Sequence, residues 1–134
     1  MNENATKWVA ALRSGEYQQG EGYLLTSDED EVKRYCCLGV ACELYHQEHP
    51  DTSRWAKNSN FDNCVVFFIE DGDDHDSEET VLPSKVQDWL GLADGEGGYD
   101  GGSLIGLNDS EKYTFNKIAD AIESEPNRLF AYTG

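Results

Sequence analysis

Apolar residues along the chain follow two spacings, one typical of helices and one typical of strands. In four segments they recur every three to four positions, which places them on one face of a helix. Glycine or proline, the residues that commonly end helices, follow each of these segments. The expected helices cover residues 5–14 with Asn4 as cap and Gly15 as stop, run from Cys37 toward Pro50, run from Pro83 to the stop at Gly91, and begin after Thr114 and close before Pro126.

Continuous or alternating apolar residues predict strands between these helices. The run Cys64–Ile69 is the most apolar in the chain, and we expect it to form a buried strand. Further strands are expected at Gly22–Thr26, Val32–Cys36 and Ser103–Leu107. The four acidic residues at 28–31 are typical of a hairpin tip between the first two of these.

Polar and glycine-rich stretches predict the loops. Residues 48–62 are polar, and residues 70–79 contain seven acidic residues in ten, which predicts a solvated loop. Residues 94–102 contain five glycines and are expected to form a mobile connector or a lid. The order of elements predicts one α+β domain over residues 1–134, with three to four helices packed on a small antiparallel or mixed sheet.

The charge of the chain narrows the choice of partners. The 134 residues carry a net charge of −17, and seventeen of the 27 acidic residues follow residue 61. Such a surface repels nucleic acid and anionic membranes, so we expect no direct binding to either. It attracts basic partners instead.

The sequence also indicates a compartment. No apolar run approaches the roughly 20 residues that span a bilayer, and residues 1–4 lack the features of a signal peptide. We therefore expect a cytoplasmic protein whose four cysteines, Cys36, Cys37, Cys42 and Cys64, are reduced thiols.

Two of these cysteines are candidates for chemistry. Cys36 and Cys37 fall at an expected strand-to-helix junction, where backbone N–H groups lower the pKa of a thiol. With a histidine such as His46 or His49 and with Asn108 or Asp109, a thiol is activated as a nucleophile. The alternative is that the cysteines are small buried apolar side chains, as free cysteines commonly are.

The remaining motifs argue against a metal or a cofactor. Cys42 and His46 lie four residues apart, but the cysteine spacing does not match that of a structural zinc site. A calcium loop beginning at Asp71 lacks the required glycine and glutamate. The glycine-rich stretch lacks the Lys-Ser/Thr ending of a phosphate-binding loop. We predict neither a metal nor a cofactor.

A polar set offers another candidate site. Gln19 precedes an expected strand, and Asn108-Asp109-Ser110 directly follows an apolar run. Amide and carboxylate groups recognise polar ligands, although the same residues also cap helices and form turns.

Several segments resemble a widespread family of small, mostly uncharacterised proteins of bacteriophages and prophages. The clearest are Tyr35-Cys36-Cys37-Leu38-Gly39-Val40 and Leu107-Asn108-Asp109-Ser110. The resemblance implies a phage-encoded accessory protein, a class in which many members counter host defences. It also implies that the recurring residues are Arg13, Gln19, Gly20, Cys36, Gly39, Asn108 and Asp109.

Three functions follow as hypotheses. The first is stoichiometric binding of a small polar or nucleotide-like ligand. The second is an acidic inhibitor or DNA mimic that covers a basic surface of a host protein, and the third is a cysteine-dependent hydrolase or transferase. A homo-oligomer is compatible with each, and a phage-encoded protein would act in the host cytoplasm. The first hypothesis assigns ligand binding to Arg13, Gln19, Cys36, Gly39, Asn108 and Asp109.

Overall fold

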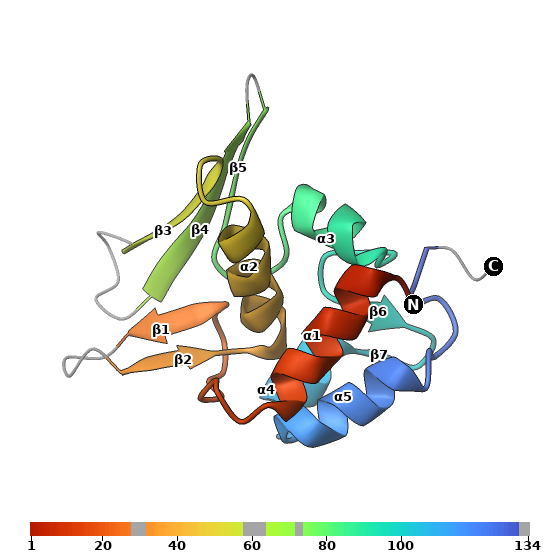
Figure 1. Cartoon of the computed structure of the whole chain (residues 1–134). Coiled ribbons are helices and arrows are strands. Elements are labelled where there is room, and N and C mark those ends of the chain that lie inside the picture. The colour runs from red at the N-terminus through yellow and green to blue at the C-terminus, as the bar shows by residue number, and fades with distance from the viewer. Residues whose placement is uncertain (28–31, 58–63, 72–73, 132–134) are drawn as a thin grey trace.

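A computed structural model describes residues 1–27, 32–57, 64–71 and 74–131 (Figure 1). Within these residues, helices and strands mix along the chain and form a small α+β fold. The elements are α1 (Glu3–Arg13), β1 (Leu25–Ser27), β2 (Lys33–Tyr35), α2 (Cys37–Glu48), β3 (Ser53–Lys57), β4 (Cys64–Asp71), β5 (Asp74–Glu78), α3 (Ser84–Leu90), β6 (Gly98–Tyr99), β7 (Gly102–Ser103), α4 (Leu104–Asp109) and α5 (Phe115–Glu123).

The main sheet has five antiparallel strands built around β4. Strand β3 runs along one side of β4, where Trp55 pairs with Phe67. The other side of β4 is shared, because β1 pairs with its first residues and β5 with its later ones, including Phe67 with Glu78. Strand β2 pairs with β1, and β6 and β7 form a separate two-stranded sheet.

The core lies between one face of the sheet and the helices. Helix α2 packs against the sheet, and α1, α3, α4 and α5 lie together on the far side of α2 (Figure 1). Along β4 the side chains of Val65, Phe67 and Ile69 are buried, whereas those of Val66 and Phe68 are only half-buried. Successive side chains of a strand point to opposite faces, so the second pair lies on the outer face of the sheet.

Much of the predicted pattern is confirmed. The four expected helices correspond to α1, α2, α3 and α5, and Thr114 caps α5 by accepting a hydrogen bond from the Lys117 N–H. Gly91 ends α3 in a left-handed conformation with φ of 78°. The buried strand is β4, and the first two strands are β1 and β2. The expected hairpin tip at 28–31 lies outside the described residues.

Two predicted loops are strands instead. Residues 48–62 contain β3, and residues 70–79 contain the end of β4 and all of β5. Strand β5 has the sequence Asp-His-Asp-Ser-Glu, so no apolar periodicity reveals it. It forms because β4 supplies backbone hydrogen-bonding partners, which do not depend on apolar side chains.

The expected strand Ser103–Leu107 is wrong as well. Its apolar residues belong to helix α4, because the Ser103 side chain accepts a hydrogen bond from the Gly106 N–H and starts a helical turn. The cap of the first helix is Asn2 rather than Asn4, whose side chain donates to the Trp89 carbonyl at 3.0 Å. The glycine-rich stretch 94–102 contains β6, and its mobility stays a prediction.

Within the described residues, no helix is both long and apolar enough to cross a membrane.

Candidate functional site

The predicted polar residues meet around Asn108, at the end of α4. This side chain is buried, and its four hydrogen bonds hold three segments together. Its Oδ1 accepts from Gln19 Nε2 at 2.9 Å and from the Cys37 N–H at 3.2 Å. Its Nδ2 donates to the Gly20 carbonyl and to Asp109 Oδ1, each at 2.8 Å. A primary amide has two donors and two acceptor lone pairs, so all of its capacity is in use.

Gln19 and Asp109 complete this network. Gln19 Nε2 also donates to the Tyr113 carbonyl at 2.7 Å, and Asp109 Oδ1 also accepts from the Gly22 N–H at 3.1 Å. Sequence reasoning thus identified residues that the fold brings together, across separations of up to 89 residues. Their hydrogen bonds are directed at one another and at the backbone, which favours the alternative that they stabilise turns and helix ends.

Arg13 is not part of this network. It lies in the last turn of α1, and its guanidinium pairs with two carboxylates of α5, Asp120 at 2.8 Å and Glu123 at 3.1 Å. These ion pairs are at the surface and connect the first and last helices. The structure therefore places Arg13 apart from Gln19, Asn108 and Asp109.

The cysteines are buried at the strand-to-helix junction, as their position in the sequence predicts. Cys36 is the N-cap of α2, and its Sγ accepts from the Gly39 N–H at 3.4 Å. Burial outweighs this contact and raises the pKa of Cys36 to about 12. Burial also raises the pKa of Cys37, whose Sγ donates to the Leu104 carbonyl at 3.6 Å.

Histidines and thiols do not pair in the described part of the chain. His46 Nδ1 lies 3.1 Å from Ser53 Oγ, and His49 Nδ1 lies 3.0 Å from the Tyr45 carbonyl. A thiol with a raised pKa and no nearby base remains neutral and is a poor nucleophile. The geometry therefore favours the reading of Cys36 and Cys37 as buried apolar side chains.

Gly39 has a packing role in the helix. A Cβ at this position would lie 1.7 Å from the Leu24 carbonyl oxygen, so only glycine lets α2 approach this part of the backbone. The close approach is between two segments of the chain rather than between the chain and a ligand. Among the described residues, no three His, Cys, Asp or Glu side chains are grouped closely enough to hold a metal ion.

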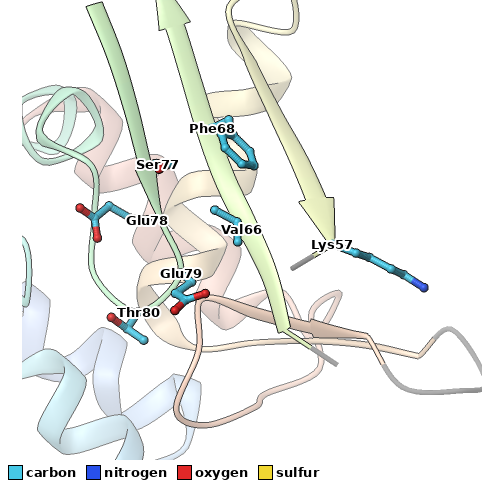
Figure 2. Close-up of a pocket in the computed structure, with 7 residues that line it drawn as sticks. All are labelled: Lys57, Val66, Phe68, Ser77, Glu78, Glu79 and Thr80. Carbon is cyan, nitrogen blue, oxygen red and sulfur yellow. The ribbon is translucent and has the colours of Figure 1, made fainter. Parts of the chain in front are cut away.

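A different candidate surface lies on the outer face of the sheet. Two adjoining shallow hollows, of about 520 and 400 Å³, follow β4 and β5 and share Phe68 and Ser77. Val66 and Phe68 lie next to each other on the floor, with Glu79 close by, whereas the Lys57 side chain points away (Figure 2). The hollows thus combine a small apolar floor with acidic side chains.

Acidic residues surround these hollows, and several have defined contacts. Glu70 Oε1 lies 3.5 Å from Arg54, whose guanidinium stacks 4.4 Å from the centroid of the Phe68 ring. Asp76 accepts from the Ser84 N–H at 3.1 Å, at the start of α3. Burial, together with its acidic neighbours, raises the pKa of Glu78.

Hydrophobic periodicity could not find this surface, because β5 is entirely polar. The signal that was present is the dipeptide Asp71-Gly72, which follows the most apolar run after a single residue, Glu70. Asp-Gly after an apolar strand is a strong indicator of a hairpin. Read as a hairpin, residues 70–79 become acidic positions on paired strands rather than a loop.

Taken together, the fold and the buried network define a small α+β domain with an acidic sheet edge. The chain belongs to the family described as "Domain of unknown function (DUF8296)", whose profile matches residues 1–126. No curated protein and no solved structure matches the chain.

Proposed function

We propose that this chain is a non-catalytic binding protein that covers a cationic surface of a partner protein. The observation that carries the proposal is the hairpin of β4 and β5. Its acidic residues stand on paired strands, at fixed register, and not on a solvated loop. Glu70 lies on β4 on the face of Phe68, whereas Asp76 and Glu78 lie on β5 on the face of the buried Ile69 and Phe67, and Glu79 directly follows β5. The hairpin therefore presents carboxylates at fixed positions on both of its faces, and fixed charges are what recognition of a basic protein surface requires.

The charge of the whole molecule supports the same function. A net charge of −17 accelerates encounter with cationic partners by electrostatic steering, and it repels nucleic acid. On the outer face of the sheet, Val66 and Phe68 supply apolar surface that a partner can cover, with Glu70 and Glu79 at its margin. Interfaces commonly have this arrangement of an apolar centre and a polar rim.

The test is binding of basic proteins and peptides by two variants that have the same net charge. In the first, Glu70, Glu78 and Glu79 are each replaced by Gln. In the second, the same change is made at Glu3, Glu96 and Glu111, which lie outside the hairpin. Each variant has three fewer negative charges, so a difference between them reports where the charge acts.

We expect the hairpin variant to lose at least tenfold in affinity at low salt, since charged contacts at an interface contribute about 1–3 kcal/mol or more. The control variant should lose much less. Equal losses would mean that binding depends only on total charge, and the proposal would then fail. Circular dichroism of both variants establishes that they remain folded.

The other hypotheses receive less support from the geometry. A small polar or nucleotide-like ligand at Gln19 and Asn108 would have to replace hydrogen bonds that the protein makes with itself. A cysteine enzyme would need an ionised thiol. That the protein is encoded by a phage and counters a host defence stays a prediction from the resemblance, as does a host protein as its partner.

A further inference from the structure

We propose that β5 accepts an extended segment of the partner as an additional strand, and that this segment alternates basic and apolar residues. The inference rests on the proposed function and specifies how the partner is bound. Strand β5 pairs with β4 along one side. Within the described residues no strand pairs with its other side, which leaves backbone N–H and C=O groups that can template another strand.

The open part of this edge has a defined lower end. The Glu79 carbonyl accepts a hydrogen bond from the Leu24 N–H at 2.7 Å, so the chain itself occupies the edge there. Above this point, no strand of the described chain other than β4 pairs with residues 74–78 along the projecting hairpin (Figure 1), and the Asp76 side chain contacts Ser84 at the start of α3. Five residues of strand span about 17 Å, enough for a partner segment of similar length.

The two faces of β5 differ in chemistry, and this sets the pattern of the partner. Asp76 and Glu78 share one face, the face on which their partners Ile69 and Phe67 are buried, and Asp76 accepts a hydrogen bond from the Ser84 N–H at 3.1 Å there. Ser77 points to the other face, beside Phe68 and the hollows. Figure 2 shows Glu78 on the far side of β5 from Val66 and Phe68.

A strand added to this edge places its own alternate residues next to these two faces. Basic side chains at every second position meet Asp76 and Glu78, and opposite charges across neighbouring strands are stabilising. Apolar side chains at the positions between them lie beside Ser77, whose small size leaves Phe68 within reach. The partner pattern is therefore basic and apolar residues with a period of two.

The same charges disfavour a second copy of this chain as the occupant. Two β5 edges placed against each other would bring Asp76 and Glu78 close to their own counterparts. Like charges on adjacent strands are destabilising, and acidic edge strands are a known device against self-pairing. The acidic side chains of β5 thus disfavour pairing with a second copy of this chain and favour pairing with a basic strand.

Three capped peptides of equal charge test the inference by nuclear magnetic resonance titration at low salt. The first is Lys-Val-Arg-Val-Lys. The second has the same sequence with N-methyl groups on all three central residues, which removes backbone donors on both edges without changing charge. The third, Lys-Lys-Arg-Val-Val, has the same composition without the alternation.

We expect the first peptide to shift the amide signals of residues 74–79 and to bind about tenfold or more tightly than the methylated one, because two or three backbone hydrogen bonds are lost. The third peptide should bind at an intermediate or lower affinity. Glu78→Gln should weaken binding of the first peptide, and Glu111→Gln should not.

The outcomes separate the two proposals. If all three peptides bind equally, or if the shifts avoid β5, strand addition is wrong, while binding of cationic partners stands. If none of the peptides and no basic protein binds, both proposals fail. Dimerisation of the chain through β5, detected by sedimentation and unaffected by an excess of the first peptide, would also overturn the strand-addition proposal.

Discussion

At the scale of single residues, Asn108 has the most consequential contacts. Four hydrogen bonds converge on one buried amide, and their partners come from the segment around Gln19, from the start of α2 and from Asp109. Removing this side chain leaves the buried backbone N–H of Cys37 and the carbonyl of Gly20 without their hydrogen-bond partner. Each unsatisfied buried group costs about 1–3 kcal/mol.

We therefore expect Asn108→Ala to lower the free energy of unfolding by about 3 kcal/mol or more. Urea denaturation measures the change. Asp109→Asn is the matched comparison, because it keeps an oxygen for the Gly22 N–H and should cost less. An Asn108→Ala protein that is as stable as the wild type but no longer binds a small ligand would restore the ligand-binding hypothesis.

Gly39 provides a second residue-scale prediction. A methyl group there would lie 1.7 Å from the Leu24 carbonyl oxygen, which belongs to buried backbone and so cannot easily move aside. Gly39→Ala should destabilise the fold by about 3 kcal/mol or more, at the upper end for overpacked cores. Gly15→Ala is the control, since no atom lies within 4 Å and only its φ of 77° opposes the change. Thermal unfolding of the two variants should differ clearly.

Glu78 makes stability depend on pH. Burial and its acidic neighbours raise its pKa in the folded state above the ordinary value. Between the ordinary and the raised pKa the folded protein binds more protons than the unfolded chain, so stability falls as pH rises through this window. At neutral pH the ionised Glu78 side chain is therefore mildly destabilising.

Glu78→Gln should accordingly be as stable as the wild type or slightly more stable at neutral pH. The advantage should shrink as the pH falls toward the ordinary pKa of glutamate. Urea denaturation across this pH range detects the change. An advantage that grows toward low pH would contradict the assigned cause of the shift.

At the scale of elements, β5 is held by its backbone rather than by apolar side chains. It pairs with β4 from Phe67 to Asp71, and the following residue, Glu79, accepts from Leu24. An acidic loop would be dispensable, whereas a strand with these contacts is not. Replacing residues 70–79 by a short Gly/Ser turn should therefore lower the melting temperature.

The matched control for this deletion is the variant in which Glu70, Glu78 and Glu79 become Gln. It removes charge but keeps every backbone hydrogen bond, so its melting temperature should be unchanged or higher. Calorimetry of both proteins separates the contribution of the strand from that of its charge. An unchanged melting temperature in the deletion would show that β5 contributes nothing to folding.

The elements that could be predicted from the sequence are those that bury a regular apolar face. Helix α5 and strand β4 belong to this class. Strands β3 and β5 lack a regular apolar face, because they lie at the edges of the sheet, where polar side chains face solvent. Helix α4 takes the place of a predicted strand because an apolar run of four residues, Leu104–Leu107, fits a strand or a helix equally well, and the decisive Ser103 cap is a single contact.

The candidate site was predictable only in part, for a related reason. The sequence identifies Gln19, Asn108 and Asp109 as polar residues beside apolar segments. It does not contain the direction in which their side chains point, because that depends on partners up to 94 residues away. Burial of the cysteines likewise depends on how α2 meets the sheet.

At the scale of the whole molecule, self-repulsion is the dominant electrostatic effect. A net charge of −17 on 134 residues destabilises the compact state, and salt screens this repulsion. Surface ion pairs such as Arg13–Asp120 weaken in salt too, but each contributes little. Relief of this repulsion should therefore outweigh the weakening of ion pairs, so that added salt raises the stability of the protein.

The melting temperature should rise as NaCl increases to about 0.5 M, where the screening length falls to a few ångströms. Sodium chloride is preferable to sulfate, because sulfate also strengthens apolar burial. The Gln variants with three fewer negative charges should show a smaller rise. A melting temperature that falls with salt would mean that ion pairs outweigh repulsion.

The network around Asn108 also has a consequence for the order of assembly during synthesis. The segment from Gln19 to Cys37 leaves the ribosome long before residue 108 is joined to the chain. Until then the Cys37 N–H and the Gly20 carbonyl lack the Asn108 side chain as a hydrogen-bond partner. Helix α2 and its strands can form early, but the hydrogen bonds of the Cys37 N–H and the Gly20 carbonyl to Asn108 await the arrival of α4. The nascent chain therefore reaches its native state only after α4 has been synthesised and the long-range hydrogen bonds of Asn108 have formed. Until then it is incompletely folded and accessible to chaperones and proteases.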